Sequence, residues 1–306
     1  MNIKKRNEYS QKMNLNGVDT ISGYIHRWIS EDDMQNGVRN NINQCNYQSS
    51  KNRTYLLINP NRQGDGERLI TSYSEFVSKM EYIFQNMGAD LSEYDVIRAD
   101  FCFNSRDQST FDTYAKLHRL LLCCLAKAYN FRNCYQSCNL WDYGRLSIAI
   151  KKDDAEAENY NKLRESDGKD ESANRLELRS KRMSGTTLEY QFLDKWFERL
   201  DRAAGCFEQV QVESNKHLAK LYLDDLQKPK KERDYISLTA FLLRYKEAIY
   251  TRRQMIALLS QFPEIKNPEK RTDRFKQHHK IEYFSQKDLL HIIKVLKQKT
   301  LEYFNT

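Results

Sequence analysis

Residues 155–181, AEAENYNKLRESDGKDESANRLELRSK, form the stretch that decides the predicted fold. Its two ends alternate apolar and polar residues, with Ala155 and Ala157 in the first end and Leu176 and Leu178 in the second. Because successive strand residues point to opposite faces of a sheet, each end predicts a half-buried strand. The polar residues between the two ends predict the loop of a hairpin. One face of this hairpin would be buried, and the other would expose charged residues and one tyrosine.

Other segments predict further strands of the same sheet. They are residues 17–29 (GVDTISGYIHRWI), 54–58 (TYLLI), 96–104 (VIRADFCFN) and 145–150 (RLSIAI). In 96–104, Arg98, Asp100 and Asn104 alternate with apolar residues that would face a core. If these strands pair in one antiparallel sheet, the polar residues lie beside those of the hairpin.

Apolar residues at helical spacing predict helices over 109–131 and 187–202, and another after the capping pattern at 72–75. The predicted fold class is therefore α+β, an antiparallel sheet with helices packed on one face. After residue 205 only helical periods occur, at 236–249, 252–262 and 285–304, with a proline-containing connection over 263–280. We expect one domain over 1–205, loose over 1–53, followed by a basic, all-helical region over 206–306.

The charge of the chain is unevenly distributed. The net charge is +8, and residues 207–306 hold 20 Lys and Arg against 13 Asp and Glu. This asymmetry favours an anionic partner, and nucleic acid first. A basic helical surface without a specific partner is the alternative.

Composition also excludes several classes of protein. No apolar run approaches the roughly 20 residues of a membrane span, and the first residues lack the apolar core of a signal peptide, so we expect a cytoplasmic protein with no membrane partner. The odd count of seven cysteines favours reduced thiols. Cys134 and Cys138 have no second ligand pair nearby, which argues against a zinc site.

The predicted polar face combines residue types that suit phosphodiester chemistry. Carboxylates hold hard cations such as Mg²⁺, and lysine or arginine binds phosphate oxygens. A tyrosine can attack phosphorus, but its usual pKa near 10 calls for a neighbouring cation, and Lys162 would lie beside Tyr160 on the same strand face. A merely solvated charged face is the other interpretation of this pattern.

The order of the motifs resembles that of a known family. A strand ending in INPN, then RADFCFN, then YNK and RLELRSKR, over about 54–200, is similar to rolling-circle plasmid replication initiators and related relaxases of conjugative elements. The resemblance implies that Tyr160 is the nucleophile and that Asp100 and Glu177 bind a metal, Mg²⁺ or Mn²⁺. It also implies that Lys162, Arg175 and Arg179 are phosphate or orientation groups.

Two positions depart from the family pattern. Asn104 stands where members often have a second aspartate, and Glu158 stands where some have a cation. Glu158 would then replace the lost metal ligand, or the site would be inactive. The sequence contains no His-hydrophobic-His motif, so the resemblance is to a tyrosine nickase of the replication initiation factor type.

The resemblance implies a metal-dependent DNA endonuclease and strand transferase that forms a 5′-phosphotyrosine link. It would initiate replication of a plasmid or phage-like element by nicking one strand at the origin, and would bind origin duplex and single strand. A host helicase or polymerase and a second copy of the chain are further candidate partners. The alternatives are a relaxase for conjugative mobilisation, a non-catalytic DNA-binding initiator or regulator, and an interaction module without affinity for nucleic acid.

Overall fold

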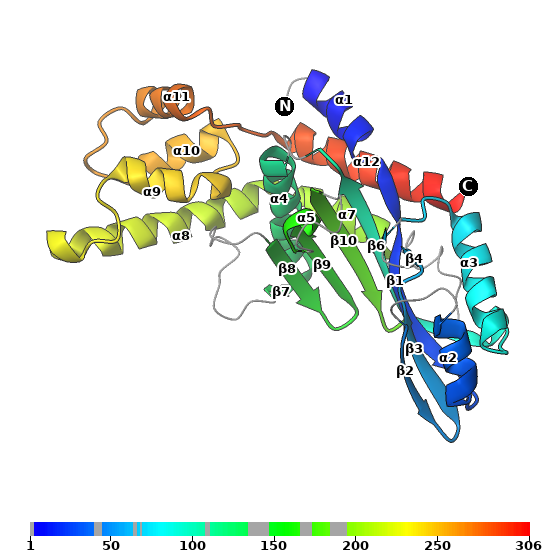
Figure 1. The fold of residues 1–306 in the computed structure, drawn as a ribbon. Helices are drawn as coiled ribbons and strands as arrows, with labels where there is room; N and C mark the ends of the chain where they lie inside the picture. The colour runs from blue at the N-terminus through cyan, green and yellow to red at the C-terminus, as the bar shows by residue number, and fades with distance from the viewer. Residues whose placement is uncertain are drawn as a thin grey trace.

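The computed structural model of the chain describes residues 3–39, 45–63, 66–67, 69–107, 111–133, 147–165, 173–183 and 195–306. Figure 1 shows a large antiparallel sheet backed by helices, with a group of further helices at one end. The predicted class, α+β with an antiparallel sheet and a helical C-terminal region, is confirmed.

The strands of the large sheet pair antiparallel throughout. Their order is β2 (Cys45–Ser50), β3 (Arg53–Ile58), β1 (Leu15–Ile25), β6 (Tyr94–Ser105), β10 (Asn174–Lys181), β9 (Ala155–Tyr160), β8 (Ser147–Lys152) and β7 (Arg132–Asn133). A separate small ribbon joins β4 (Arg62–Gln63) to β5 (Gly66–Glu67). The hairpin predicted over 155–181 is present, because β9 and β10 are direct neighbours.

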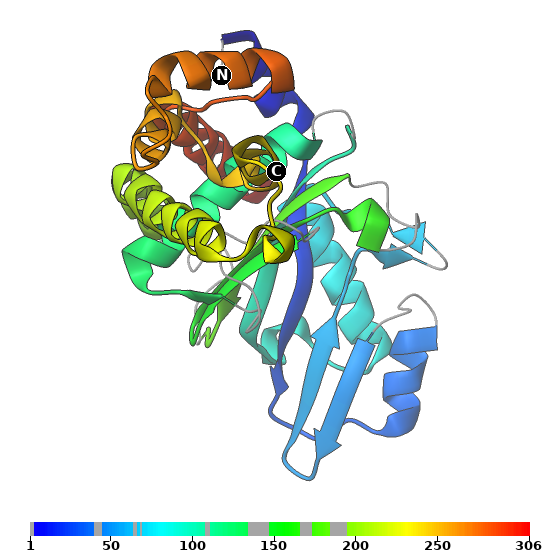
Figure 2. The same cartoon turned by 90° about the vertical axis from the view of Figure 1, so that its left-hand side faces the viewer.

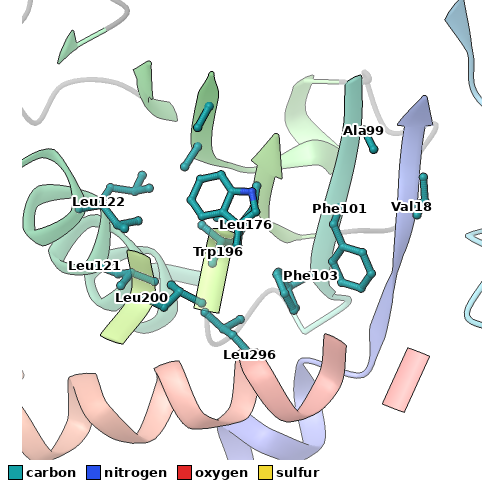
Figure 3. Close-up of a cluster of buried hydrophobic side chains, with 14 of the residues drawn as sticks. Val18, Ala99, Phe101, Phe103, Leu121, Leu122, Leu176, Trp196, Leu200 and Leu296 are labelled. Atoms are coloured by element: carbon teal, nitrogen blue, oxygen red, sulfur yellow. The ribbon is translucent and has the colours of Figure 1, made fainter. Parts of the chain in front are cut away.

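Helices cover the apolar face of the sheet. They are α3 (Tyr73–Asn86), α4 (Phe111–Tyr129), α7 (Phe197–Gly205) and α12 (Gln286–Phe304). Figure 3 shows Phe101 and Leu176 of the sheet gathered with Leu121 of α4 and Leu296 of α12. Trp196, directly before α7, lies in the same cluster. Burying a large apolar side chain contributes about 1.5–3 kcal/mol, so the alternate residues of each strand anchor the sheet to these helices.

The described residues of the N-terminal part form helices and strands of the fold, so the prediction of a loose segment is wrong over 3–39 and 45–53. Helix α1 (Ile3–Lys12) buries Tyr9 completely, and the next strand, β1, lies in the interior of the sheet. The Tyr9 hydroxyl forms a hydrogen bond with buried His118 at 2.8 Å. Helix α2 (Glu31–Arg39) and strand β2 follow. The sequence predicts no element in α2 and β2 because both are rich in polar residues. Strand β2 can be polar because it lies at the edge of the sheet.

The predicted region 206–306 is divided between two hydrophobic cores. Helices α8 (Phe207–Gln227), α9 (Leu238–Arg244), α10 (Arg252–Leu259) and α11 (Pro268–His279) share a second core that includes Leu218, Phe241 and Phe275. Figure 2 shows this lobe at the other end of the molecule from the β2–β3 hairpin. Helix α12 returns to the first core, where it packs against β1, α1 and α7.

Helix α11 replaces the connection that the sequence predicts over 263–280. Asn267 caps it by accepting from the Lys270 N–H, and Pro268 occupies the first turn. Proline is tolerated in the first turn because a backbone N–H at that position would have no intrahelical partner. Pro268 therefore begins a helix instead of preventing one.

Short elements complete the described structure: 3₁₀ turns at Leu91–Glu93, Lys230–Glu232 and Lys246–Ala248, and α5 (Lys162–Glu165). Cys134, Cys138, the first residues of the 145–150 strand and the first half of the helix predicted over 187–202 lie outside the described residues. Within the described ranges, no helix combines the length and apolar character needed to cross a membrane.

Candidate active site on the polar face of the sheet

The register of three adjacent strands sets the predicted site residues side by side. Figure 1 shows β9, β10 and β6 as neighbours near the middle of the sheet. Directly opposed residues of antiparallel strands share a face and lie within side-chain contact. The opposed residues on this face are Arg175 with Tyr160 and Asn104, Glu177 with Glu158 and Cys102, and Arg179 with Glu156 and Asp100.

The Arg179 guanidinium lies at the centre of four carboxylates. Its Nη1 donates to Glu156 Oε1 at 2.6 Å. Its Nη2 donates to Glu177 Oε2 at 3.0 Å and to Glu158 Oε2 at 3.2 Å. Its Nε lies 3.5 Å from Asp100 Oδ2. One arginine therefore neutralises carboxylates from all three strands and fixes their positions.

Two carboxylates of this cluster are buried and the other two, Glu156 and Glu158, are half-buried, whereas the sequence predicts an exposed face. Asp100 and Glu177 are 1% and 2% exposed. Burial raises the pKa of Asp100 to about 6, even though a hydrogen bond from Arg98 acts in the opposite direction. Burial likewise raises the pKa of Glu158. The cluster is thus a polar interior whose charges depend on one another, as expected where ions leave water together.

Tyr160 belongs to the same cluster. Its hydroxyl donates to Glu177 Oε2 at 3.2 Å, and the residue is 8% exposed. Burial, and then the nearby Glu177 carboxylate, raise the pKa of Tyr160 well above its usual value. The hydroxyl is therefore protonated at rest and already bonded to a group that can accept its proton. The convergence of Tyr160, Glu177 and Asp100 is the arrangement that the motif order predicts.

Lys162 does not lie on the strand with Tyr160, so that part of the prediction is wrong. Strand β9 ends at Tyr160, and Asn161 caps the short helix α5 by accepting from the Arg164 N–H at 3.0 Å. The Lys162 ammonium pairs with Glu165 at 2.8 Å and lies 5.8 Å from the centroid of the Tyr160 ring. Lys162 is therefore close to the face of the Tyr160 ring, but its position is set by helix α5.

Asn104 acts as a link between strands. Its Oδ1 accepts from Arg175 Nε at 2.7 Å, while its Nδ2 donates to the Leu15 carbonyl at 3.1 Å. Arg175 Nη1 in turn pairs with Asp19 Oδ1 at 3.0 Å. An aspartate at position 104 would place an oxygen against the Leu15 carbonyl, so the amide suits this position. These contacts fix the Arg175 side chain, which lies opposite Tyr160 on the neighbouring strand.

Sequence reasoning missed Asp19 and the role of the Asn59–Pro60–Asn61 turn. Asn61 is 1% exposed, and its Nδ2 donates to the Val18 and Asp19 carbonyls at 2.9 and 3.2 Å. These carbonyls lie where the β1–β6 register shifts, at a bulge that includes Asp19. A charged residue inside the apolar strand sequence GVDTI was the available signal, because a buried aspartate requires a partner.

The carboxylates of the cluster are the residues that would hold the implied metal. Asp100, Glu158 and Glu177 offer the carboxylate oxygens that Mg²⁺ or Mn²⁺ takes, and all three converge on one centre of positive charge. That centre is the Arg179 guanidinium. Over the described part of the chain, no three His, Cys, Asp or Glu side chains are arranged to hold a metal ion. The donors are of the type that a divalent metal takes, and the Arg179 guanidinium lies between them.

Comparisons with known proteins add no assignment. No family model matches the chain, and no curated protein or solved structure matches it either. Functional inference therefore depends on the arrangement of the residues themselves.

Proposed function

We propose that this protein cuts and rejoins one strand of DNA through Tyr160, as the initiator of replication of a plasmid or phage-like element. One observation carries the proposal. The Tyr160 hydroxyl donates to Glu177, and Glu177 shares the Arg179 guanidinium with Asp100 and Glu158. A nucleophile, its proton acceptor and a set of paired charges thus converge on one sheet face.

The proposed cleavage step needs no reagent other than the DNA and the side chains of this protein. The Tyr160 oxygen attacks phosphorus while its proton passes to Glu177. The bond from phosphorus to the 3′ oxygen breaks, and the departing oxygen receives the proton. The products are a 5′-phosphotyrosine link and a free 3′-hydroxyl, and the reverse reaction reseals the strand.

Cations near the tyrosine would bind the phosphate in this proposal. Arg175 lies opposite Tyr160, Lys162 lies over its ring, and Arg179 contacts the proton acceptor. Asp100 and Glu177, with Glu158, would hold Mg²⁺ or Mn²⁺ once Arg179 turns from the carboxylates to the phosphate. The bound metal would supply Lewis-acid stabilisation of the phosphate charge.

The helical lobe would bind the duplex at the origin. Helix α11 buries only Thr272 and Phe275 and leaves a basic surface exposed. The exposed cations on α11 are Lys270, Arg271, Arg274 and Lys276. Contacts of this kind neutralise phosphates and weaken steeply with salt. A cytoplasmic location, a host helicase or polymerase as partner, and a homodimer are parts of the same proposal.

A covalent-adduct assay tests the proposal. The protein is incubated with Mg²⁺ or Mn²⁺ and single-stranded oligonucleotides that tile the DNA flanking its coding sequence, and denaturing gels detect a DNA-linked species. We expect the adduct from wild type and from Tyr82→Phe, which alters an exposed tyrosine of α3. We expect none from Tyr160→Phe. Wild-type DNA cleavage that Tyr160→Phe leaves intact would contradict the proposal.

A second candidate function is a non-catalytic DNA-binding initiator or regulator with the same fold. The observation that favours it is the placement of Arg179 where a metal would need to bind. Binding of DNA with no adduct under either metal would support this alternative. A relaxase for conjugative transfer would use the same chemistry, and differs in supporting transfer of the element between cells.

A further inference from the structure

A groove of about 500 Å³ lies at the far end of the same sheet face. Tyr24 of β1, Arg53 and Tyr55 of β3, and Gln48 and Ser50 of β2 line it, together with Ile97. In Figure 1 these strands form the end of the sheet away from helices α8–α11. None of the residues that line the groove belongs to the charged cluster, although Ile97 lies on β6, the strand that carries Asp100.

Two rings and one guanidinium form the wall of the groove. The Tyr24 and Tyr55 rings lie 5.4 Å apart between centroids and are tilted by 58°. The Arg53 guanidinium carbon lies 4.6 Å from the centroid of the Tyr24 ring. Aromatic rings and arginine planes are the surfaces on which unpaired nucleobases stack.

Arg53 has unused hydrogen-bonding capacity. It is exposed, and in the part of the chain that the structure describes its guanidinium makes neither an ion pair nor a hydrogen bond. The guanidinium carbon lies over the Tyr24 ring, and the guanidinium N–H groups can donate to phosphate oxygens. Gln48 is also exposed on this wall and offers an amide to base edges.

The sheet register connects the groove to the candidate active site. Thr20 of β1 lies opposite Asp100, and Tyr24 lies opposite Tyr55. Thr20 and Tyr24 are four residues apart on an alternating strand and therefore share a face. At about 3.3 Å per residue, the groove begins about 13 Å along β1 from the carboxylate cluster.

We propose that this groove binds bases of the single DNA strand next to the scissile phosphate, by stacking on Tyr24 and Tyr55 and pairing a phosphate with Arg53. The inference rests on the proposed function, since it assigns the groove to the strand that Tyr160 would cut. It makes the far end of the sheet a binding site for unpaired DNA, whose bases are free to stack. The paired bases of a duplex already stack on one another and are not free to stack on these rings.

Binding of labelled oligothymidylate tests the assignment independently of cutting. Fluorescence anisotropy is measured with EDTA over a series of salt concentrations, in full-length protein that carries Tyr160→Phe. We expect Tyr24→Leu and Tyr55→Leu each to weaken binding by about tenfold, because stacking on one base is lost. Tyr24→Phe and Tyr55→Phe keep the rings and should bind as the parent does. Arg53→Leu should weaken binding and flatten its salt dependence.

The same variants are titrated with a duplex of equal length, and thermal melting verifies that each is folded. Duplex affinity should change less than twofold. Leucine variants that bind oligothymidylate as tightly as the parent, or that lose duplex binding equally, would overturn the assignment. Failure of adduct formation together with the expected tenfold losses would refute the nuclease and keep the groove. Adduct formation together with unchanged binding would refute the groove alone.

Discussion

Two arginines on one face of the sheet behave in opposite ways. Arg179 lies in the middle of the sheet and bonds to carboxylates from three strands. Arg53 lies near the end of the sheet, exposed, and stacks on Tyr24. Both occupy alternating positions of antiparallel strands, so the pattern of each strand alone does not separate them. The partners on neighbouring strands make one arginine part of the protein interior and leave the other exposed.

The difference between the two arginines suggests an order of events on DNA. The groove around Arg53 can bind a strand without rearrangement, because its guanidinium edges are open. In the proposed mechanism, the cluster around Arg179 would first exchange internal ion pairs for contacts with phosphate. Binding energy from the groove would then help to open the cluster, in the way that remote contacts contribute to a reaction.

The largest expected effect comes from removing the central arginine. Arg179→Met leaves buried carboxylates without their shared cation and should lower the free energy of unfolding by about 3–5 kcal/mol. Arg53→Met is the matched control, and a change within about 0.5 kcal/mol is expected there. Urea unfolding of both variants at pH 7 measures the difference. Equal losses from the two substitutions would show that the contrast between these arginines is false.

The next effect concerns pH. The folded-state pKa of Asp100 is raised to about 6, above its usual value near 4, so the folded protein binds the proton more tightly than the unfolded chain. Stability from this group is therefore present below about pH 4 and is lost as pH rises towards 6. Between pH 4 and 7, wild type should lose about 2–3 kcal/mol more than Asp100→Asn does.

Asp153→Asn, at the exposed turn between β8 and β9, is the control for removing a carboxylate. Unfolding free energies are measured at both pH values for the three proteins. If wild type and Asp100→Asn respond to pH identically, Asp100 is not the buried carboxylate that the cluster requires.

A smaller loss of stability is expected when the bulge at Asp19, which pairs with Arg175, loses its support from Asn61. Asn61→Ala would leave the Val18 and Asp19 carbonyls and the Ile70 N–H without their buried partner. We expect a loss of about 2 kcal/mol. Asn86→Ala, which removes one exposed hydrogen bond to Tyr82, should change stability by no more than about 0.5 kcal/mol. Comparable values for both variants would mean that Asn61 does not hold the bulge at Asp19.

Local alternation accounts for what could be predicted from the sequence. The strands with clear period-two patterns, over 54–58, 96–104 and 155–181, appear as β3, β6, β9 and β10. The convergence of Asp100, Glu177 and Tyr160 followed from the same alternation, because strands that share an apolar face also share a polar one.

Features that depend on tertiary partners could not be predicted. Helix α1 contributes little more than Tyr9 to the core, so its sequence resembles a polar arm. The return of α12 to the first core depends on surfaces more than 200 residues away in sequence. The closure of the cluster by Arg179 required the cross-strand register, and Lys162 was misplaced because the Asn161 cap ends the strand.

Mapping the covalent link tests the central claim most directly. Digestion after lysine and arginine releases residues 153–162, DDAEAENYNK, whose single tyrosine is Tyr160. After reaction of the wild-type protein with single-stranded DNA and Mn²⁺, and nuclease trimming of the DNA, mass spectrometry identifies the modified peptide. We predict a nucleotide joined through a 5′ phosphate to Tyr160 in this peptide. Cleaved DNA with the link on another residue, or with no link to the protein, would contradict the claim.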